Sequence, residues 1–167
     1  MLYAILHSLS INLHMSIRVR KFREADAAKV SNIIKKGFRS IISDDYSKKS
    51  VEWQIKENSP KKLTEKAKNV KYYVAVDGDK VLGFGGYNAE KVHTFFVDPG
   101  IHGKGIGSKI MERVLSDAKK DGVKAVKCWA TFNSVQFYSK FGFKKLKKIK
   151  LRSGKNSITF MEMKKKL

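Results

Sequence analysis

Apolar residues recur every three or four positions from Ala27 to Ile41, and lysines and an arginine lie between them. This spacing is typical of a helix that packs one face on a core and exposes the other face to water. One or two shorter helices are expected over 47–58 and 60–68, with Pro60 placed to begin a turn of helix. An alternating run that starts at Ser16 precedes them, so the chain is expected to open with one strand followed by helices.

From position 71 onward, the pattern alternates between strands and helices. β-rich runs at 71–76 and 81–87 flank an Asp-Gly pair, which favours a tight hairpin turn. A third run at 92–97 is followed by a glycine-rich loop and by a helical stripe from Ile106 to Ala118. The pattern then predicts a strand at 123–130, a short helix at 133–141 and strands at 143–151 and 158–163. This order indicates a mixed α/β domain.

Length and composition fit one compact domain, since 167 residues with 42% hydrophobic side chains can build a single core. Residues 1–14 precede the first strand pattern and are expected to be an extension outside the core fold, with residues 15–167 forming the domain. An ordered element packed on the body is the alternative. No apolar run reaches the ~18 residues that a membrane span requires. The single cysteine, Cys128, excludes an internal disulfide or a cysteine-rich zinc site, so a cytoplasmic protein without metal or membrane partner is expected.

The chain is strongly basic, with 36 Lys and Arg against 15 Asp and Glu and a formal net charge of +21. A large share of this excess lies after Lys140, where Glu162 is the only acidic residue. Three readings stay open: a solvated lysine-rich surface, attraction of a polyanionic coenzyme, and a nucleic-acid partner.

A glycine-rich segment, His102-Gly103-Lys104-Gly105-Ile106-Gly107, lies between a predicted strand and a predicted helix. Glycines at alternate positions allow a ligand to approach the backbone closely, and the helix behind them directs N–H groups and its positive dipole end forward. This arrangement favours phosphate binding. The segment has neither the spacing of the dinucleotide fingerprint nor the Gly-Lys-Ser/Thr of the P-loop.

Two motifs resemble those of one enzyme superfamily. The run from Phe95 to Gly107, with its Val-Asp-Pro and glycine loop, resembles the acetyl-coenzyme A motif of the GNAT N-acetyltransferases, although His102 stands where Arg or Gln is usual. The run from Asn133 to Phe143 is similar to their second motif, an Asn five residues before a Tyr and then Gly-Phe. The resemblance implies a mixed, mostly antiparallel sheet of six to seven strands, flanked by about four helices.

The resemblance further implies an enzyme that moves the acetyl group of acetyl-CoA directly to a primary amine of a small molecule or protein. In this superfamily the strand that ends at Val97 separates from the next strand, and the pantetheine arm fills the gap. The coenzyme is expected to contact Phe95, Phe96, Val97, His102, Gly103, Lys104, Gly105, Ile106, Gly107, Ser108, Asn133 and Lys140.

Two residues are candidates for proton transfer. Tyr138 matches the superfamily tyrosine near the coenzyme sulfur, and a phenol can donate a proton to a thiolate; core packing is its alternative role. His93 is the candidate base, because strand alternation would place it on one face with Phe95 and Val97. Glu90 or a water is the reserve base. Asn133 is expected to bind pantetheine, and a helix-capping role is compatible with this. Cys128 is expected to be a core side chain.

The acceptor is not indicated by any motif. Asp44, Asp45, Glu52 and Glu57, in the helical region that shapes the acceptor site in this superfamily, are the acids available to bind a cationic acceptor. A homodimer stays open as well. The alternative function is a non-catalytic, nucleic-acid-binding module on the same fold, because a fold does not guarantee activity.

Overall fold

The computed structural model describes residues 16–101 and 103–167. The predicted extension at 1–14 and the predicted coenzyme contact of His102 therefore lie outside the described residues. The helices are α1 (Ala27–Ser40), α2 (Lys48–Lys56), α3 (Pro60–Lys66), α4 (Ile106–Lys120) and α5 (Val135–Lys140), with short 3-10 turns at Glu24–Asp26, Pro99–Ile101 and Phe132–Ser134. The strands are β1 (Arg18–Lys21), β2 (Lys71–Asp77), β3 (Lys80–Tyr87), β4 (Val92–Val97), β5 (Ala125–Ala130), β6 (Lys144–Ser153) and β7 (Asn156–Lys166).

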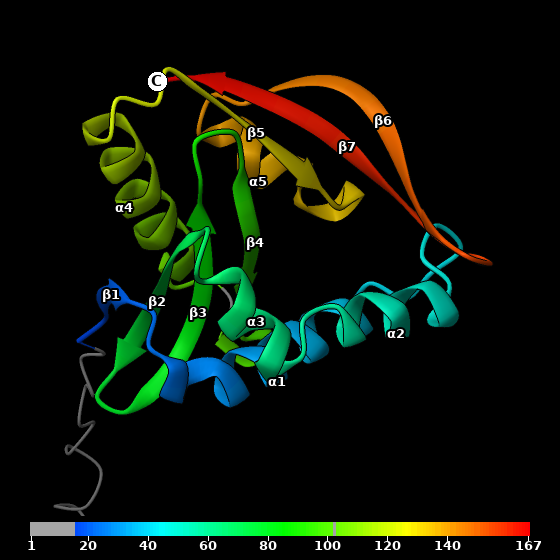
Figure 1. Ribbon diagram of the computed structural model, residues 1–167, viewed down its shortest axis with the longest axis horizontal. Helices are drawn as coiled ribbons and strands as arrows, with labels where there is room; N and C mark the ends of the chain where they lie inside the picture. The colour runs from blue at the N-terminus through cyan, green and yellow to red at the C-terminus, as the bar shows by residue number, and fades with distance from the viewer. Residues whose placement is uncertain (1–15, 102) are drawn as a thin grey trace, which may run out of the picture.

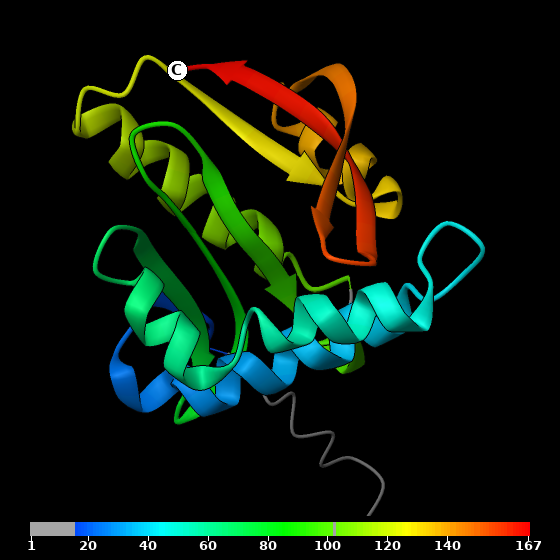
Figure 2. The same ribbon diagram turned by 45° about the vertical axis from the view of Figure 1, so that its right-hand side comes forward.

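The strands form two antiparallel sheets, one in the order β1-β2-β3-β4 and the other in the order β5-β7-β6 (Figure 1). The sheets meet at a single parallel bridge between Lys91 and Lys127, where the Lys127 N–H also donates to the Glu90 carbonyl at 2.9 Å. Beyond that bridge β4 and β5 diverge toward their C-terminal ends (Figure 2). The expected mixed, mostly antiparallel fold is confirmed, and the seven strands of the described residues are divided at this divergence.

The local sequence signals account for most element boundaries. Asp77 pairs with Lys80 across a two-residue turn in which Gly78 has φ +55°, a conformation that glycine adopts without strain. The apolar stripe of α1 is buried, with Val30 and Ile34 fully enclosed. Gly122, just past the end of α4, has φ +79°, as expected for a glycine after a helix. The predicted hairpin and helices are therefore confirmed.

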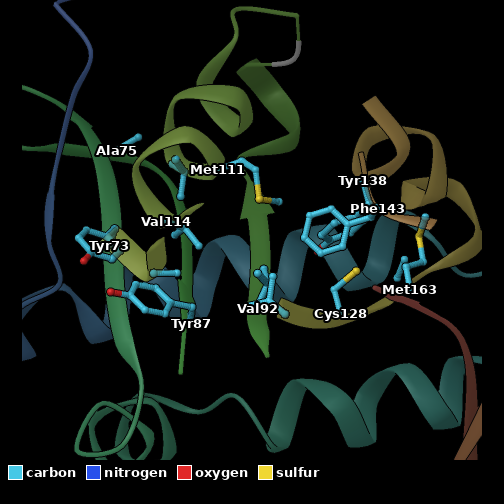
Figure 3. Close-up of a cluster of buried hydrophobic side chains, with 14 of the residues drawn as sticks. Tyr73, Ala75, Tyr87, Val92, Met111, Val114, Cys128, Tyr138, Phe143 and Met163 are labelled. Carbon is cyan, nitrogen blue, oxygen red and sulfur yellow. The ribbon is translucent and has the colours of Figure 1, made fainter. Parts of the chain in front are cut away.

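Two hydrophobic clusters cover opposite faces of the first sheet. On one face, Tyr73 and Leu82 pack with Ile110 of α4, and this cluster continues past Val92 to Tyr138 and the second sheet. Figure 3 shows it as a row that runs from Tyr73 and Tyr87 to Phe143 and Met163. On the other face the cluster comes mainly from α1, α2, α3 and β2, with Ile158 and Phe160 of β7. The first sheet thus has α4 on one side and α1–α3 on the other.

None of the described helices is both long and apolar enough to cross a membrane. Within residues 16–101 and 103–167, no group of three or more His, Cys, Asp or Glu side chains is placed to hold a metal ion.

Candidate active site

A cleft of about 700 Å³ lies where β4 and β5 diverge. Its lining comes from both sides of the sheets. One half is lined by Phe95, Val97, Gly107, Asn133, Phe137 and Tyr138, from β4, α4 and the α5 region. The other half is lined by Trp53, Gln54, Glu57, Asn58, Lys66, Lys91, His93 and Trp129, from α2, α3, β4 and β5. We call these the α5 half and the α3 half of the cleft.

The two halves meet at an irregularity in β4. Phe84 of β3 pairs with Phe96, and Gly86 pairs with His93, so three steps along β4 match two steps along β3. Thr94, inside this bulge, has φ +44°. A bulge of one residue reverses the faces of all side chains on one side of it.

The prediction that His93 shares a face with Phe95 and Val97 is wrong for this reason. The Phe95 ring faces Tyr138, with 6.4 Å between the ring centroids, whereas the Phe96 ring packs on Phe38 of α1 at 4.9 Å. His93, three residues before Phe96, lies on the same side as Phe96, close enough to Lys66 of α3 for the lysine charge to affect it. The imidazole therefore points into the α3 half of the cleft.

His93 is a weak base in this environment. Burial lowers the pKa of His93 from 6.5 to about 4, and the charges of Lys91 and Lys66 act in the same direction. Its Nε2 atom is buried and has no hydrogen-bond partner among the described residues. The side chain is thus neutral at pH 7, with an unsatisfied nitrogen facing the cleft.

Tyr138 lies in the α5 half, with only 6% of its surface exposed. Its ring packs edge-on against Phe137 and Phe143, so it also contributes to the core. Burial, followed by the nearby Cys128 thiol, raises the pKa of the Tyr138 hydroxyl, which keeps it protonated at neutral pH. Cys128 itself is fully buried and burial raises its pKa to about 12, in agreement with the expected core role.

The glycine loop leads directly into α4. Gly103 and Gly105 have φ values of +80° and +69°, and Gly105 is the residue that precedes the helix. The first intrahelical bond runs from the Lys109 N–H to the Gly105 carbonyl at 3.0 Å, so the preceding N–H groups lack helical acceptors. A Cβ atom on Gly107 would lie 3.3 Å from the Phe137 ring and 3.4 Å from Val97, both of which line the cleft.

The other predicted coenzyme contacts are distributed differently. Phe95, Phe96, Val97 and Asn133 line the cleft, whereas Gly103, Lys104, Gly105, Ile106 and Ser108 lie in or next to the loop and do not line it. The Ile106 side chain is buried in the core, which leaves only its backbone for a ligand. Lys140 is exposed at the end of α5 and is not part of the cleft.

Asn133 does not cap α5, because Ser134 occupies the N-cap position. Its Oδ1 atom accepts a hydrogen bond from the Thr131 hydroxyl at 2.7 Å. The capping role considered for Asn133 is therefore wrong, and its exposed side chain borders the α5 half of the cleft.

The acids expected near the acceptor are mostly elsewhere. Glu57 lines the cleft but forms an ion pair with Lys62 at 2.6 Å, and Glu52 pairs with Arg39 at 2.8 Å outside it. Asp44 and Asp45 are exposed, and so is Glu90, which lies in the β3–β4 turn and does not line the cleft. The sequence analysis missed Trp53, Gln54, Asn58, Lys66, Lys91 and Trp129, because no local pattern links these residues.

Comparison with known proteins agrees with this geometry. Residues 42–167 match the family of acetyltransferase (GNAT) domains. The chain belongs to the GNAT acetyltransferase family. An uncharacterised N-acetyltransferase of Methanocaldococcus jannaschii is 28% identical over 81 residues, which are 47% of this chain and 36% of that protein. The chain thus spans about a third of the length of this curated relative.

Solved structures show the same GNAT fold. The GCN5-related N-acetyltransferase from Rhodopseudomonas palustris has a TM-score of 0.82 and 19% identity, covering 90% of this chain and 95% of that chain. The PaiA N-acetyltransferase from Thermoplasma acidophilum, solved with coenzyme A, has a TM-score of 0.74 and 22% identity, covering 92% and 100%. These comparisons give no support to a nucleic-acid-binding module.

Proposed function

We propose that this GNAT domain is an N-acetyltransferase that moves the acetyl group of acetyl-CoA directly to a primary amine. The observation that carries the proposal is the continuous cleft between β4 and β5, whose α5 half is lined by Gly107 of α4 and by Tyr138 and whose α3 half is lined by His93, Lys66 and Lys91. A transferase that acts on two substrates needs room for both, and the two halves of the cleft provide it.

The α5 half suits the coenzyme. Only the Lys91–Lys127 bridge joins β4 to β5 among the described residues, so an extended pantetheine arm can pair with the β4 backbone near Phe96 and Val97. The N–H groups at the start of α4 suit the pyrophosphate, and the absence of a side chain at Gly107 leaves room beside Val97 and Phe137. The Thermoplasma relative was solved with coenzyme A.

The chemistry needs a neutral amine, a polarised thioester carbonyl and a proton for the leaving sulfur. Acetyl-CoA, when bound, supplies the thioester. A β4 backbone N–H near Val97 can donate to the thioester oxygen, and the protonated Tyr138 hydroxyl can donate to the departing thiolate. The amine loses a proton as the new C–N bond forms, and the neutral His93 imidazole, in the α3 half, accepts it directly or through water.

A two-step experiment tests the function. Acetyl-CoA should raise the melting temperature, since a ligand that binds only the folded state stabilises it. With coenzyme at saturation, a panel of primary amines should then release free thiol in an amine-dependent manner. No stabilisation together with no amine-dependent thiol release would contradict the proposal.

A further inference from the structure

Lys66 places an ammonium group at the wall of the α3 half. Its Nζ donates to the Glu57 carbonyl at 2.7 Å and to Asn58 Oδ1 at 3.2 Å, both uncharged acceptors. An ammonium has three N–H donors, which leaves one for a ligand. Burial lowers the pKa of Lys66, because the ammonium is poorly solvated where it lies. The charge of Glu57 raises this pKa and the charge of Lys62 lowers it, both by less than burial does.

Lys91 places a second ammonium at the wall of the same half. Its Nζ lies 3.1 Å from the centroid of the Trp129 ring, and the side chain is half-buried. Burial lowers the pKa of Lys91 as well. The charges of Glu90 and Glu162 raise this pKa and the charge of Lys127 lowers it. An ammonium held on an aromatic face keeps donors available for an anion.

The acidic residues of this region already form ion pairs with other lysines. Glu57 pairs with Lys62, and Glu162 pairs with Lys127 at 3.5 Å. Neither Lys66 nor Lys91 forms an ion pair within the part of the chain that the structure describes. Two positive charges in the α3 half are therefore not neutralised by a direct ion pair among the described residues.

Two further polar atoms there lack partners. Trp129 Nε1 and His93 Nε2 are both buried without a hydrogen bond among the described residues, and both side chains line the cleft. The indole N–H can only donate. A buried polar group without a partner costs free energy unless a ligand satisfies it.

We propose that the acceptor is a small primary amine that carries a carboxylate, and that Lys66, Lys91 and the Trp129 N–H bind this carboxylate. These groups offer donors and positive charge, which match the oxygens of an anion. The same charges disfavour a protonated amine and so favour the neutral form that attacks the thioester. Polycationic acceptors would be repelled.

This inference rests on the proposed acetyltransferase function and is tested with pairs of amines that differ in the carboxylate alone. In the first pair, leucine and isopentylamine, the carboxylate lies next to the amine. In the second pair, 6-aminohexanoate and hexylamine, it lies at the far end of the chain. We expect at least one carboxylated member to exceed its neutral partner in kcat/KM by about tenfold to a hundredfold, the range for a hydrogen-bonded charge. The N-acetylated products are also titrated into protein saturated with coenzyme A, where the same carboxylated member should bind more tightly.

Variants connect this preference to the two lysines. Lys66→Gln and Lys91→Gln should each remove most of the preference by raising KM for the carboxylated amine, with little change for its neutral partner. Lys61→Gln is the matched control, because Lys61 is exposed on the same helix, α3, and does not line the cleft. Because Lys66 also anchors two groups of the α2–α3 connection, Lys66→Arg is included to keep the charge if the Gln variant unfolds.

The outcomes separate this inference from the function on which it rests. If acetyl-CoA binds and the neutral amine is used as well as or better than its carboxylated partner in both pairs, the carboxylate proposal fails while the acetyltransferase function stands. Product titrations without any preference for the carboxylate, or lysine variants with unchanged selectivity, also overturn it. If acetyl-CoA neither binds nor reacts, the function itself fails.

Discussion

His93 and Phe95 are two residues apart on β4 but face opposite sides of the sheet, because the bulge at Thr94 lies between them. Phe95 faces Tyr138 and the α5 half of the cleft, whereas His93 faces Lys66 and the α3 half. One strand thus contributes to both halves of the cleft. The arrangement places the candidate base on the side from which an amine would approach.

The His93 environment predicts an unusual pH profile. A base must be deprotonated to act, and burial with Lys91 and Lys66 lowers the pKa of His93 to about 4. The acidic limb that His93 creates in kcat, measured with the amine at saturation, should therefore lie near pH 4 rather than near pH 6.5. His93→Gln should lower kcat and remove that acidic limb, as measured by kcat against pH. An unchanged rate and an unchanged acidic limb would mean that water, and not His93, accepts the proton of the amine.

Tyr138→Phe should reduce kcat by ~10²–10⁴, the range for loss of a general acid, with coenzyme affinity unchanged. The ring packing against Phe137 and Phe143 is kept, so the melting temperature should change little. Single-turnover kinetics and calorimetry measure the two effects.

Tyr87→Phe is the control for this substitution. Its hydroxyl donates to Asp121 at 2.6 Å at the other end of the same core, so its loss should lower stability and leave kcat intact (Figure 3). Near-normal turnover in the Tyr138 variant would mean that the phenol is only a packing residue.

Gly107→Val should weaken coenzyme binding by about tenfold or more, through loss of charged hydrogen bonds at the start of α4. The added side chain would contact Phe137 and Val97, where the coenzyme is expected to pass. Gly105→Val should act in the same direction, with added strain from its φ of +69°. Isothermal titration with coenzyme A measures the affinity.

Gly122→Ala separates backbone strain from ligand binding. Gly122 also has a positive φ but lies at the far end of α4, away from the cleft. It should cost about 1–2 kcal/mol of stability without a change in affinity. Full coenzyme affinity in the Gly105 and Gly107 variants would remove the loop from the proposed site.

Expression from Met15 tests the predicted extension at residues 1–14. The described fold begins with β1 at Arg18, which pairs with Val76 of β2, so the shortened chain retains every described strand. Its melting temperature and coenzyme affinity should equal those of the full chain. A melting temperature lower by many degrees, or insoluble protein, would show that the segment packs on the domain.

Local sequence patterns determined the elements, the hairpin turn at Gly78 and the glycine loop before α4, because helix periodicity, turn conformation and free N–H groups depend on neighbouring residues. Tertiary structure alone decided the face of His93, since a bulge is defined by pairing with β3. It also decided the chamber of Lys66, Lys91 and Trp129, which lie on separate elements and meet only after the sheets have formed. Burial there lowers the pKa values of Lys66 and Lys91 and leaves Trp129 Nε1 without a partner among the described residues.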